Sequence, residues 1–268
     1  MGFLRRLFTD REGRTPDSMS PAVEVSPPAV TSRFEVGWAT DPGKVRDHNE
    51  DSALVITAAQ DGEDLRPPFG LFIVADGMGG HRAGEVASSL AIRATARHIT
   101  QQCYLPSLVD GDRDAGQPAL TEIITGAVHA ANNAVSQRVP GGGTTLTCAL
   151  VLGSQAYIAH VGDSRAYVLN EEGLHQITQD HSLVDRLVET GQLTRDEAAV
   201  HPQRNVLYRA VGQSSTLEVD THVRKISPGE HLFLCSDGLW DMVDETEVIE
   251  LITEAASAQS ACENLVGA

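Results

Sequence analysis

Stretches of apolar residues divide the chain into elements that alternate between strand and helix patterns. Residues 70–75 form a continuous apolar run with the length of one fully buried strand. The run ends on Asp76-Gly77, and residues 231–235 repeat the design by leading through Ser236 into Asp237-Gly238. Glycine lets backbone groups approach a ligand closely. Two such units suggest that Asp76 and Asp237 meet at one site, although for either unit alone an ordinary Asp-Gly turn is the alternative.

Short apolar or β-branched runs predict further strands, at residues 34–38, 53–56, 144–152, 155–161, 165–169 and 216–225. The three strands between residues 144 and 169 are joined by tight turns, so they are interpreted as an antiparallel meander. Gly162-Asp163-Ser164 forms one of these turns. Asp163 either only shapes this turn or is a further acid of the site.

Apolar residues at three- and four-residue steps predict amphipathic helices at residues 84–99 and 120–139, with a loop at 105–118. Shorter helices are expected near residues 183–188, from 194, after Asp244 and near 258. The segment 183–206 is polar, helical and inserted between strands. Such an insertion is typical of a flap over a site.

Residues 1–32 differ in composition from the rest. A short basic amphipathic start at residues 1–8 is followed by a region rich in Pro, Ser and Thr. This pattern predicts a disordered tail, because one short segment buries too little surface to anchor stably. A weak membrane or partner tether is the alternative. Residues 33–268 would then form the folded domain.

The charge balance and the cysteines narrow the functional classes. A net charge of −17 argues against a nucleic-acid partner, since phosphate backbones attract Lys and Arg. Divalent cations held in a carboxylate cluster would still allow the protein to bind phosphate locally. The four cysteines show no Cys-x-x-Cys spacing, and Cys148 and Cys235 lie in apolar runs, which indicates buried residues in a reduced, cytosolic setting. No apolar run approaches the length of a membrane span.

Seven short motifs follow one another along the chain. They are Arg46-x-x-Asn49-Glu50-Asp51, Val74-Ala-Asp76-Gly77-Met-Gly79-Gly80-His81, Gly143-Thr144-Thr145, Val161-Gly-Asp163-Ser-Arg165, Thr178-Gln-Asp180-His181-Ser182, Leu207-x-Arg209-Ala-x-Gly212 and Ser236-Asp237-Gly238-Leu-Trp-Asp241. In this order the motifs resemble the metal-dependent Ser/Thr protein phosphatase family, the protein phosphatase 2C type, in its bacterial form. The resemblance covers the chain from about Phe34 to the last residue.

The resemblance implies both a fold and a reaction. The fold would be α+β, a four-layer α-β-β-α sandwich of two antiparallel sheets flanked by helices, with a helical flap at about residues 183–206. The reaction would be hydrolysis of phosphoserine and phosphothreonine by a metal-bridging hydroxide, with two Mn²⁺ or Mg²⁺ ions and a third, weaker one. The chemistry agrees, because phosphomonoester hydrolysis needs a nucleophile and cancellation of charge, and hard cations bound by oxygen ligands supply both.

By the family pattern, Asp76 bridges the two metals, the Gly77 carbonyl binds one of them and Asp237 binds the other. Asp163 matches the position that, together with Asp237, binds the third ion.

Three further residues take roles around these ligands by the same resemblance. Glu50 and Asp51 would hold metal-bound waters. Arg46 would clamp the substrate phosphate, for which a guanidinium fork is suited.

The sequence departs from the family pattern in two places. Eukaryotic relatives carry a His directly after the Asp-Gly, proposed as the general acid, where this chain has Met78; His81 is a nearby substitute, and metal-bound water is the alternative. The family also has a further metal-ligating Asp in an Asp-Asn-x-Thr motif that starts a closing strand, and no Asp-Asn pair follows Asp237. We therefore expect a truncated domain that lacks its C-terminal strand, exposes a sheet edge, binds the metal on the Asp237 side weakly and turns over slowly.

Two functional hypotheses follow. The first is a metal-dependent phosphatase, a monomer, acting on phosphorylated Ser/Thr proteins that a Ser/Thr kinase produces. The second is a pseudophosphatase, a regulatory module that binds phosphoproteins with impaired turnover because the C-terminal metal ligand is absent. The presence together of Arg46, Glu50, Asp51, Asp76, Asp163 and Asp237 favours the enzyme, and the missing terminal Asp is the one feature that favours the alternative.

Overall fold

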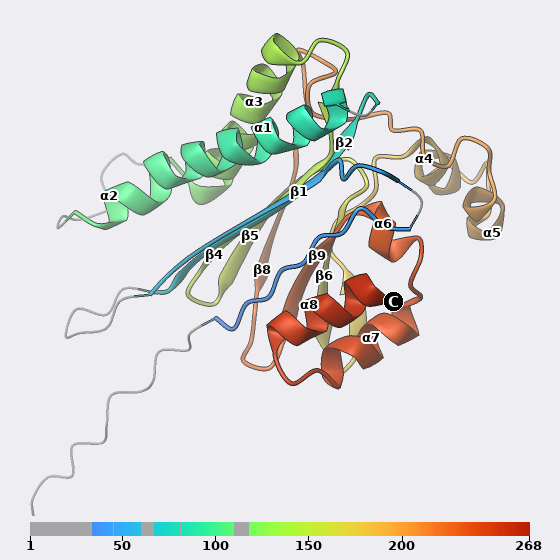
Figure 1. The fold of residues 1–268 in the computed structure, drawn as a ribbon. Coiled ribbons are helices and arrows are strands. Elements are labelled where there is room, and N and C mark those ends of the chain that lie inside the picture. Colours follow the sequence, from blue (N-terminus) through green and yellow to red (C-terminus); the bar gives the residue numbers. More distant parts are fainter. Residues whose placement is uncertain (1–33, 45, 60–66, 81, 110–117) are drawn as a thin grey trace, which may run out of the picture. The chain divides into compact units, whose positions relative to one another are not determined.

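The structure, a computed structural model, describes residues 34–268 except 45, 60–66, 81 and 110–117. Two antiparallel sheets form its centre (Figure 1). The larger sheet has the order β1-β2-β4-β5-β8, with β3 beside β2, and the smaller has the order β7-β6-β9. The strands of the larger sheet are β1 (Asp51–Ala58), β2 (Phe69–Met78), β3 (Gly143–Thr144), β4 (Leu146–Leu152), β5 (Gln155–Val161) and β8 (Asp220–Lys225). Those of the smaller are β6 (Arg165–Asn170), β7 (Gly173–Gln176) and β9 (His231–Cys235).

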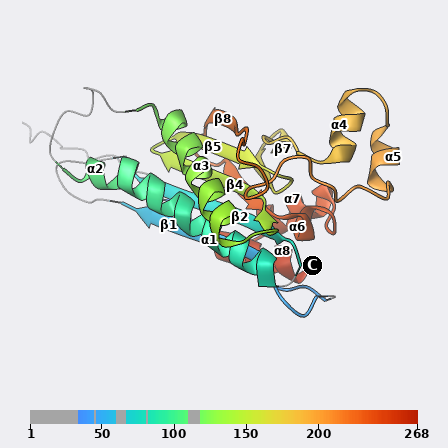
Figure 2. The same cartoon turned by 90° about the horizontal axis from the view of Figure 1, so that it is seen from above.

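Helices cover the outer face of each sheet, as Figures 1 and 2 show. α1 (Arg82–Ile99) and α3 (Leu120–Arg138) pack on the larger sheet, and a π-helical turn (Thr100–Tyr104) and α2 (Leu105–Ser107) extend α1. α7 (Glu245–Thr253) and α8 (Ala258–Gly267) cover the smaller sheet. The layers are therefore α-β-β-α, and the fold class predicted from the sequence is confirmed.

Successive side chains of β2 pack into two different apolar layers, one on each face of the larger sheet. Leu71 and Ile73 are fully buried in the core beneath α1 and α3. Phe72 points the other way and packs with Ala166 and Leu234 of the smaller sheet. Because successive side chains of a strand face opposite sides, a continuous apolar run is what a strand between two apolar layers requires.

The predicted strand at residues 34–38 is absent, because this segment pairs with no strand among the described residues. It lies instead against the start of α8. The Ala258 N–H donates to Glu35 Oε1 (2.8 Å), and the side chain of Gln259 bonds both the N–H and the carbonyl of Trp38 (3.2 and 3.1 Å). A Cβ added at Gly37 would overlap the Ala258 carbonyl. The alternating pattern thus reflects packing on a helix.

The predicted meander is also wrong at its third strand. β4 and β5 form a hairpin, but β6 pairs with β7 and β9 in the other sheet. The turn between β5 and β6 carries the chain from one sheet to the other, with Gly162 at φ +110°. β7, which the sequence did not reveal, completes the smaller sheet.

Part of the predicted loop at residues 105–118 is also helical, since Leu105–Ser107 form α2. Residues 110–117 of that loop and the predicted tail at 1–32 lie outside the described residues.

The segment predicted as a flap contains α4 (Leu183–Glu189) and α5 (Arg195–Ala199), which stand away from the sheets in both views (Figures 1 and 2). Its two ends are joined by a bridge between Ser182 and Leu207 and by a hydrogen bond from Leu183 N to the Val206 carbonyl (2.7 Å). The expectations about a flap function, a truncated domain and an absent closing strand stay predictions.

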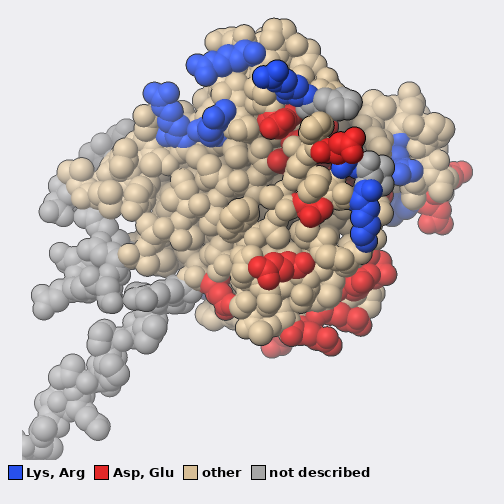
Figure 3. Space-filling view, viewed as in Figure 1, with Lys and Arg blue, Asp and Glu red and all other residues tan. Residues whose placement is uncertain are grey.

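Three general properties of the described residues accompany this fold. None of their helices combines the length and apolarity needed to cross a membrane. Figure 3 shows acidic side chains gathered over the layer of α7 and α8, where α7 carries Glu245, Glu247 and Glu250. Cys148 and Cys235 are buried as predicted, and burial raises the pKa of each thiol to about 12.

Candidate metal centre

The first two acids of the site face each other across adjacent strands. Asp51 opens β1 and is the register partner of Asp76 near the end of β2. Directly opposed side chains of an antiparallel pair lie about 5 Å apart, close enough for two carboxylates to share a proton or a cation. The backbone around them is tightly packed, because a Cβ added at Gly77 would overlap the Gly84 carbonyl and approach the Glu50 carbonyl to 2.7 Å. This close approach explains the glycines that follow Asp76.

The third acid arrives from the distant end of the chain. Asp237 does not end a strand, as the sequence suggested, but begins the short helix α6 (Asp237–Trp240) directly after β9. Ser236 precedes it, and its hydroxyl donates to Asp51 Oδ2 (2.6 Å) instead of capping α6. Asp76 lies within hydrogen-bonding reach of both Asp51 and Asp237. The two strand-end units therefore meet at one site.

A fourth acid lies on the turn that switches sheets. Asp163 is buried, and its carbonyl accepts a hydrogen bond from the Trp240 indole N–H (3.0 Å). Burial, followed by the charges of Asp237 and Asp180, raises the pKa of Asp163 to about 7. The side chain thus belongs electrostatically to the same cluster.

The cluster carries more negative charge than its surroundings neutralise. Burial, followed by the charges of Asp51 and Asp237, raises the pKa of Asp76 to about 9, and burial raises the pKa of Asp51. Within the described part of the chain, no Lys, Arg or His forms a salt bridge with Asp51, Asp76, Asp163 or Asp237. Buried carboxylates without a cationic partner are costly unless a metal or a proton compensates them.

The oxygen atoms of this cluster are of the kind that divalent cations bind. Glu50 Oε1 is buried without a hydrogen-bond partner beside this cluster, and hard cations prefer carboxylate, carbonyl and water oxygens. As the side chains stand, no group of three or more acids, imidazoles or thiols in the described residues encloses a point where an ion could sit. The carboxylates of Asp76 and Asp237 instead lie close enough together that Asp237 contributes to the raised pKa of Asp76. The side chains present are nevertheless of the type that hard cations bind, so they fit a divalent cation chemically.

The remaining predicted residues lie at the rim or outside the described residues. Arg46 leaves 63% of its side chain exposed, and its Nη1 lies 3.3 Å from Glu50 Oε2. Burial raises the pKa of Asp51, and the charge of Arg46 opposes this rise to a small extent, so the guanidinium lies near the acids. His81, the predicted acid, lies outside the described residues. Met78 is half-buried, and its sulfur is 3.4 Å from Gln213 Nε2.

Comparison with known proteins agrees with this geometry. The family described as "Protein phosphatase 2C" matches residues 41–268 of the chain. The chain belongs to the protein phosphatase 2C family. It is therefore a serine/threonine protein phosphatase, a class of metal-dependent hydrolases, as the motifs predicted.

Similar proteins of this family include both curated relatives and solved structures. The serine/threonine phosphatase stp of Listeria monocytogenes is 41% identical over 218 residues, which cover 80% of this chain and 81% of that protein. The crystal structure of the Mycobacterium tuberculosis serine/threonine phosphatase PstP/Ppp is 36% identical, with a TM-score of 0.67, over 85% of this chain and 88% of that one. A structure of the PstP catalytic domain with two manganese ions is 33% identical, with a TM-score of 0.65, over 85% and 87% of the two chains.

Several supporting residues of this phosphatase were not singled out from the sequence. Thr145 accepts a hydrogen bond from the Asp76 N–H at Oγ1 (2.8 Å), and the same hydroxyl contacts Ser164 Oγ (2.6 Å). Thr147 Oγ1 donates to the Ser164 carbonyl (2.7 Å). These contacts join Asp76 to the Asp163 turn. Thr145 and Ser164 lie within two of the seven motifs, and this was the only indication in the sequence that they support the site.

Proposed function

We propose that this phosphatase hydrolyses phosphoserine and phosphothreonine in proteins at the cluster of Asp76, Asp237, Asp51 and Asp163. The observation that carries the proposal is that Asp76 reaches both Asp51 and Asp237, although these residues come from β1, β2 and the start of α6. An assembly of repelling buried carboxylates is expected at a functional site and is unfavourable elsewhere.

The residues that would hold the metals follow the family pattern, and their oxygen donors fit it. The Asp76 carboxylate, the Gly77 carbonyl and Asp237 would hold two cations, while Glu50 and Asp51 would orient water bound to them. Asp163 and Asp237 would hold a third, weaker cation. We propose Mn²⁺ or Mg²⁺, since all donors are hard oxygens, and manganese is supported by the related PstP structure that contains two manganese ions.

When bound, the cations supply an activated water and neutralise charge on the phosphoryl oxygens. The protein's own part is to bind and orient the phosphomonoester. Arg46 is exposed at the rim, where its guanidinium can donate two parallel hydrogen bonds to phosphate oxygens. Its contact with Glu50 holds the side chain over the acids. His81 as the group that protonates the leaving oxygen stays a prediction.

A phosphopeptide assay tests this function. The full chain should release phosphate from phosphoserine and phosphothreonine peptides with Mn²⁺ present and should stop when EDTA is added. Asp76→Asn should abolish turnover, and Arg46→Ala should lower kcat/KM about 100-fold while leaving Mn²⁺ binding intact. Glu122→Gln, an exposed acid of α3, is the matched control. Turnover that persists in Asp76→Asn would remove the proposed centre.

The finer expectations about partners belong here as well. We propose that the substrates are phosphorylated by a Ser/Thr kinase and that the protein is a monomer; the cytosolic setting stays a prediction. The alternative, a phosphoprotein-binding module without turnover, finds no support in the relatives named above, which are described as phosphatases. Binding of phosphopeptides without Mn²⁺-dependent hydrolysis would favour it.

A further inference from the structure

His181 holds the turn that carries Asp163. It is fully buried where the chain enters the flap segment. Its backbone N–H donates to the Gly162 carbonyl (2.7 Å), and its Nδ1 accepts from the Gly162 N–H (3.0 Å). Gly162 directly precedes Asp163 and has φ +110°, a conformation that side-chain-bearing residues rarely adopt. The two hydrogen bonds therefore hold both backbone polar groups of a residue with an unusual conformation.

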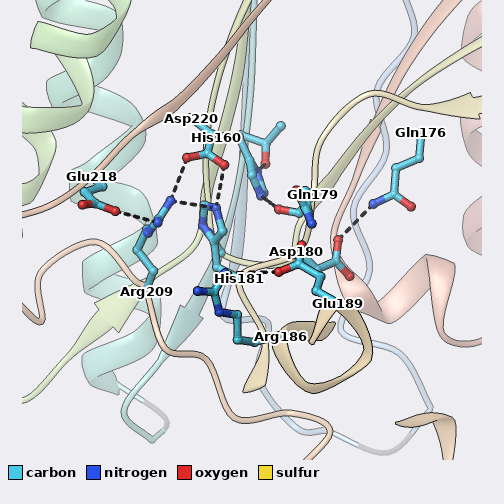
Figure 4. A network of polar contacts seen from close by, with 12 residues as sticks. His160, Gln176, Gln179, Asp180, His181, Arg186, Glu189, Arg209, Glu218 and Asp220 are labelled. Atoms are coloured by element: carbon cyan, nitrogen blue, oxygen red, sulfur yellow. Dashed lines mark hydrogen bonds and ion pairs between the residues drawn. The ribbon is translucent and has the colours of Figure 1, made fainter. Parts of the chain in front are cut away.

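The ring of His181 is itself oriented by charged neighbours (Figure 4). Because Nδ1 accepts a hydrogen bond from Gly162, the ring proton lies on Nε2, which donates to Asp220 Oδ2 (3.1 Å). Arg209 Nη1 lies 3.0 Å from the same Nε2. Arg209 Nη1 donates to the other oxygen of Asp220 (2.7 Å), and Nη2 donates to Glu218 (2.8 Å). A carboxylate that fixes the tautomer and angle of a functional imidazole is a recurring arrangement at metal centres.

The same residues form the base of the flap segment. The Tyr208 N–H donates to the His181 carbonyl (3.0 Å), next to the bridge between Ser182 and Leu207. His181 therefore stands on one side of this stem and Arg209 on the other, and both meet Asp220 of β8. The contacts reach without a break from the flap stem to the Asp163 turn.

We propose that His181, oriented by Asp220 and Arg209, is a positioning residue that fixes the Gly162 peptide so that the Asp163 carboxylate faces Asp237. This inference rests on the proposed function, because it takes Asp163 to hold the weakest cation of the centre. Without the acceptor at Nδ1, the Gly162 N–H is buried without a partner and the turn relaxes. Removing a residue that orients a metal ligand lowers metal affinity by about 10- to 100-fold.

Two substitutions separate the acceptor from the rest of the ring. His181→Asn places an amide oxygen near the position of Nδ1 and keeps an acceptor for Gly162. His181→Gln reaches the position of Nε2, which keeps a donor to Asp220 and loses that acceptor. Hydrogen exchange of the Gly162 amide and calorimetric titration with Mn²⁺ are measured on the full chain, with Asp163→Asn as the reference for loss of the weakest site.

The expected result is that His181→Gln loses protection of the Gly162 amide and binds the weakest Mn²⁺ about tenfold less tightly, whereas His181→Asn stays within about threefold of the wild type. Equal behaviour of the two variants in both measurements, or a wild type without a weak Mn²⁺ site that Asp163→Asn removes, overturns the proposal. If His181→Gln does not fold, Asp220→Asn decides, since it should loosen the ring and weaken the same site. A wild type that binds no Mn²⁺ at all refutes the proposed function, while amide exchange still reports on the hydrogen bonds that hold Gly162.

Discussion

The peptide unit of Asp76 is fixed while its carboxylate is left in an unfavourable environment. Its N–H donates to Thr145 Oγ1, and its carbonyl accepts from the Thr145 N–H (2.9 Å) and from Thr144 Oγ1 (2.7 Å). The carboxylate faces Asp51 and Asp237, whose charges disfavour its ionised form. A rigid backbone that carries a carboxyl group whose ionised form its surroundings disfavour indicates that the residue is placed for binding a cation, because stability alone would select a neutral side chain.

Asp76→Asn should therefore stabilise the metal-free protein. Removing one of several repelling buried carboxylates is expected to raise the free energy of unfolding by about 1–3 kcal/mol at pH 7. Urea unfolding in EDTA measures the difference, with Glu122→Gln as control. Mn²⁺ should stabilise the wild type and leave Asp76→Asn almost unaffected. A destabilised variant in EDTA would mean that the carboxylates are already compensated within the protein.

Sequence reasoning at the residue scale found the acids and missed what holds them. Asp76 and Asp237 follow apolar runs, so periodicity exposes them. Arg165 gives no such signal, yet it pairs with Asp180 (2.7 Å) and stacks on the Trp240 ring (3.6 Å to its centroid). Its partners are 15 and 75 positions away, and no local pattern specifies contacts of that kind.

His160 should make the protein sensitive to acid. It is buried on β5 between Thr147 and the Gln179 carbonyl (2.9 and 3.0 Å), and it faces His181 and Asp220. Burial, followed by the charge of His181, lowers the pKa of His160 from 6.5 to about 3. Between about pH 3 and pH 6.5, His160 is therefore protonated in the unfolded chain but not in the folded chain. The stabilisation is complete above about pH 6.5 and is lost as the pH falls towards 3.

The test compares the wild type with His160→Gln. The free energy of unfolding of the wild type should fall by about 1–3 kcal/mol more than that of the variant between pH 6.5 and 4. His181 and Asp220 titrate in both proteins, so the difference isolates His160. Parallel curves would show that His160 is charged or solvated in the folded protein.

At the scale of elements, the crossing of β2 with the start of α1 decides where the acids stand. Gly77 and Gly84 touch backbone to backbone there, and the Gly77 N–H donates to the Glu50 carbonyl (3.1 Å). The segment before β1 is thereby drawn against the end of β2, next to Asp76. The sequence revealed these glycines as a motif, but the contact between them depends on how the helix packs.

Gly77→Ala should be strongly destabilising. The added methyl group would overlap the Gly84 carbonyl and lie 2.7 Å from the Glu50 carbonyl oxygen. Both are backbone groups, which cannot rotate away as a side chain could. We expect a loss of about 3 kcal/mol or more in the free energy of unfolding, together with weaker Mn²⁺ binding. Gly267→Ala, where nothing lies within 4 Å, should change stability by less than about 0.5 kcal/mol. A Gly77→Ala variant as stable as Gly267→Ala would show that the helix and strand are not in contact.

Element prediction failed where one short connection changes sheets. Tight turns between successive strands favour hairpins, and this rule held for β4 and β5 but not for β6. The reason is that Gly162 bends the chain out of the larger sheet while Thr145 and His181 hold the turn in place. The error affects function, because this bend is what brings Asp163 to the acid cluster.

At the scale of the whole molecule, two sheets packed face to face bring distant parts of the chain to one edge. β1 and β2 belong to the larger sheet, and β9 with α6 belongs to the smaller one. The interior between them is apolar, built around Ala149, Ile158 and Ala166. Apolar patterning indicated most of the strands and helices, whereas the four layers were implied by the resemblance that the motifs carry. The position of the acids at their common edge required the motifs, because packing alone does not determine which ends meet.

The most direct test of the central claim is an anomalous difference map at the manganese absorption edge, from crystals of the full chain grown with Mn²⁺. We predict peaks that adjoin the Asp76 carboxylate, one beside the Gly77 carbonyl and one beside Asp237. A map with no peak within coordination distance of Asp76, or with manganese bound only elsewhere, would contradict the account.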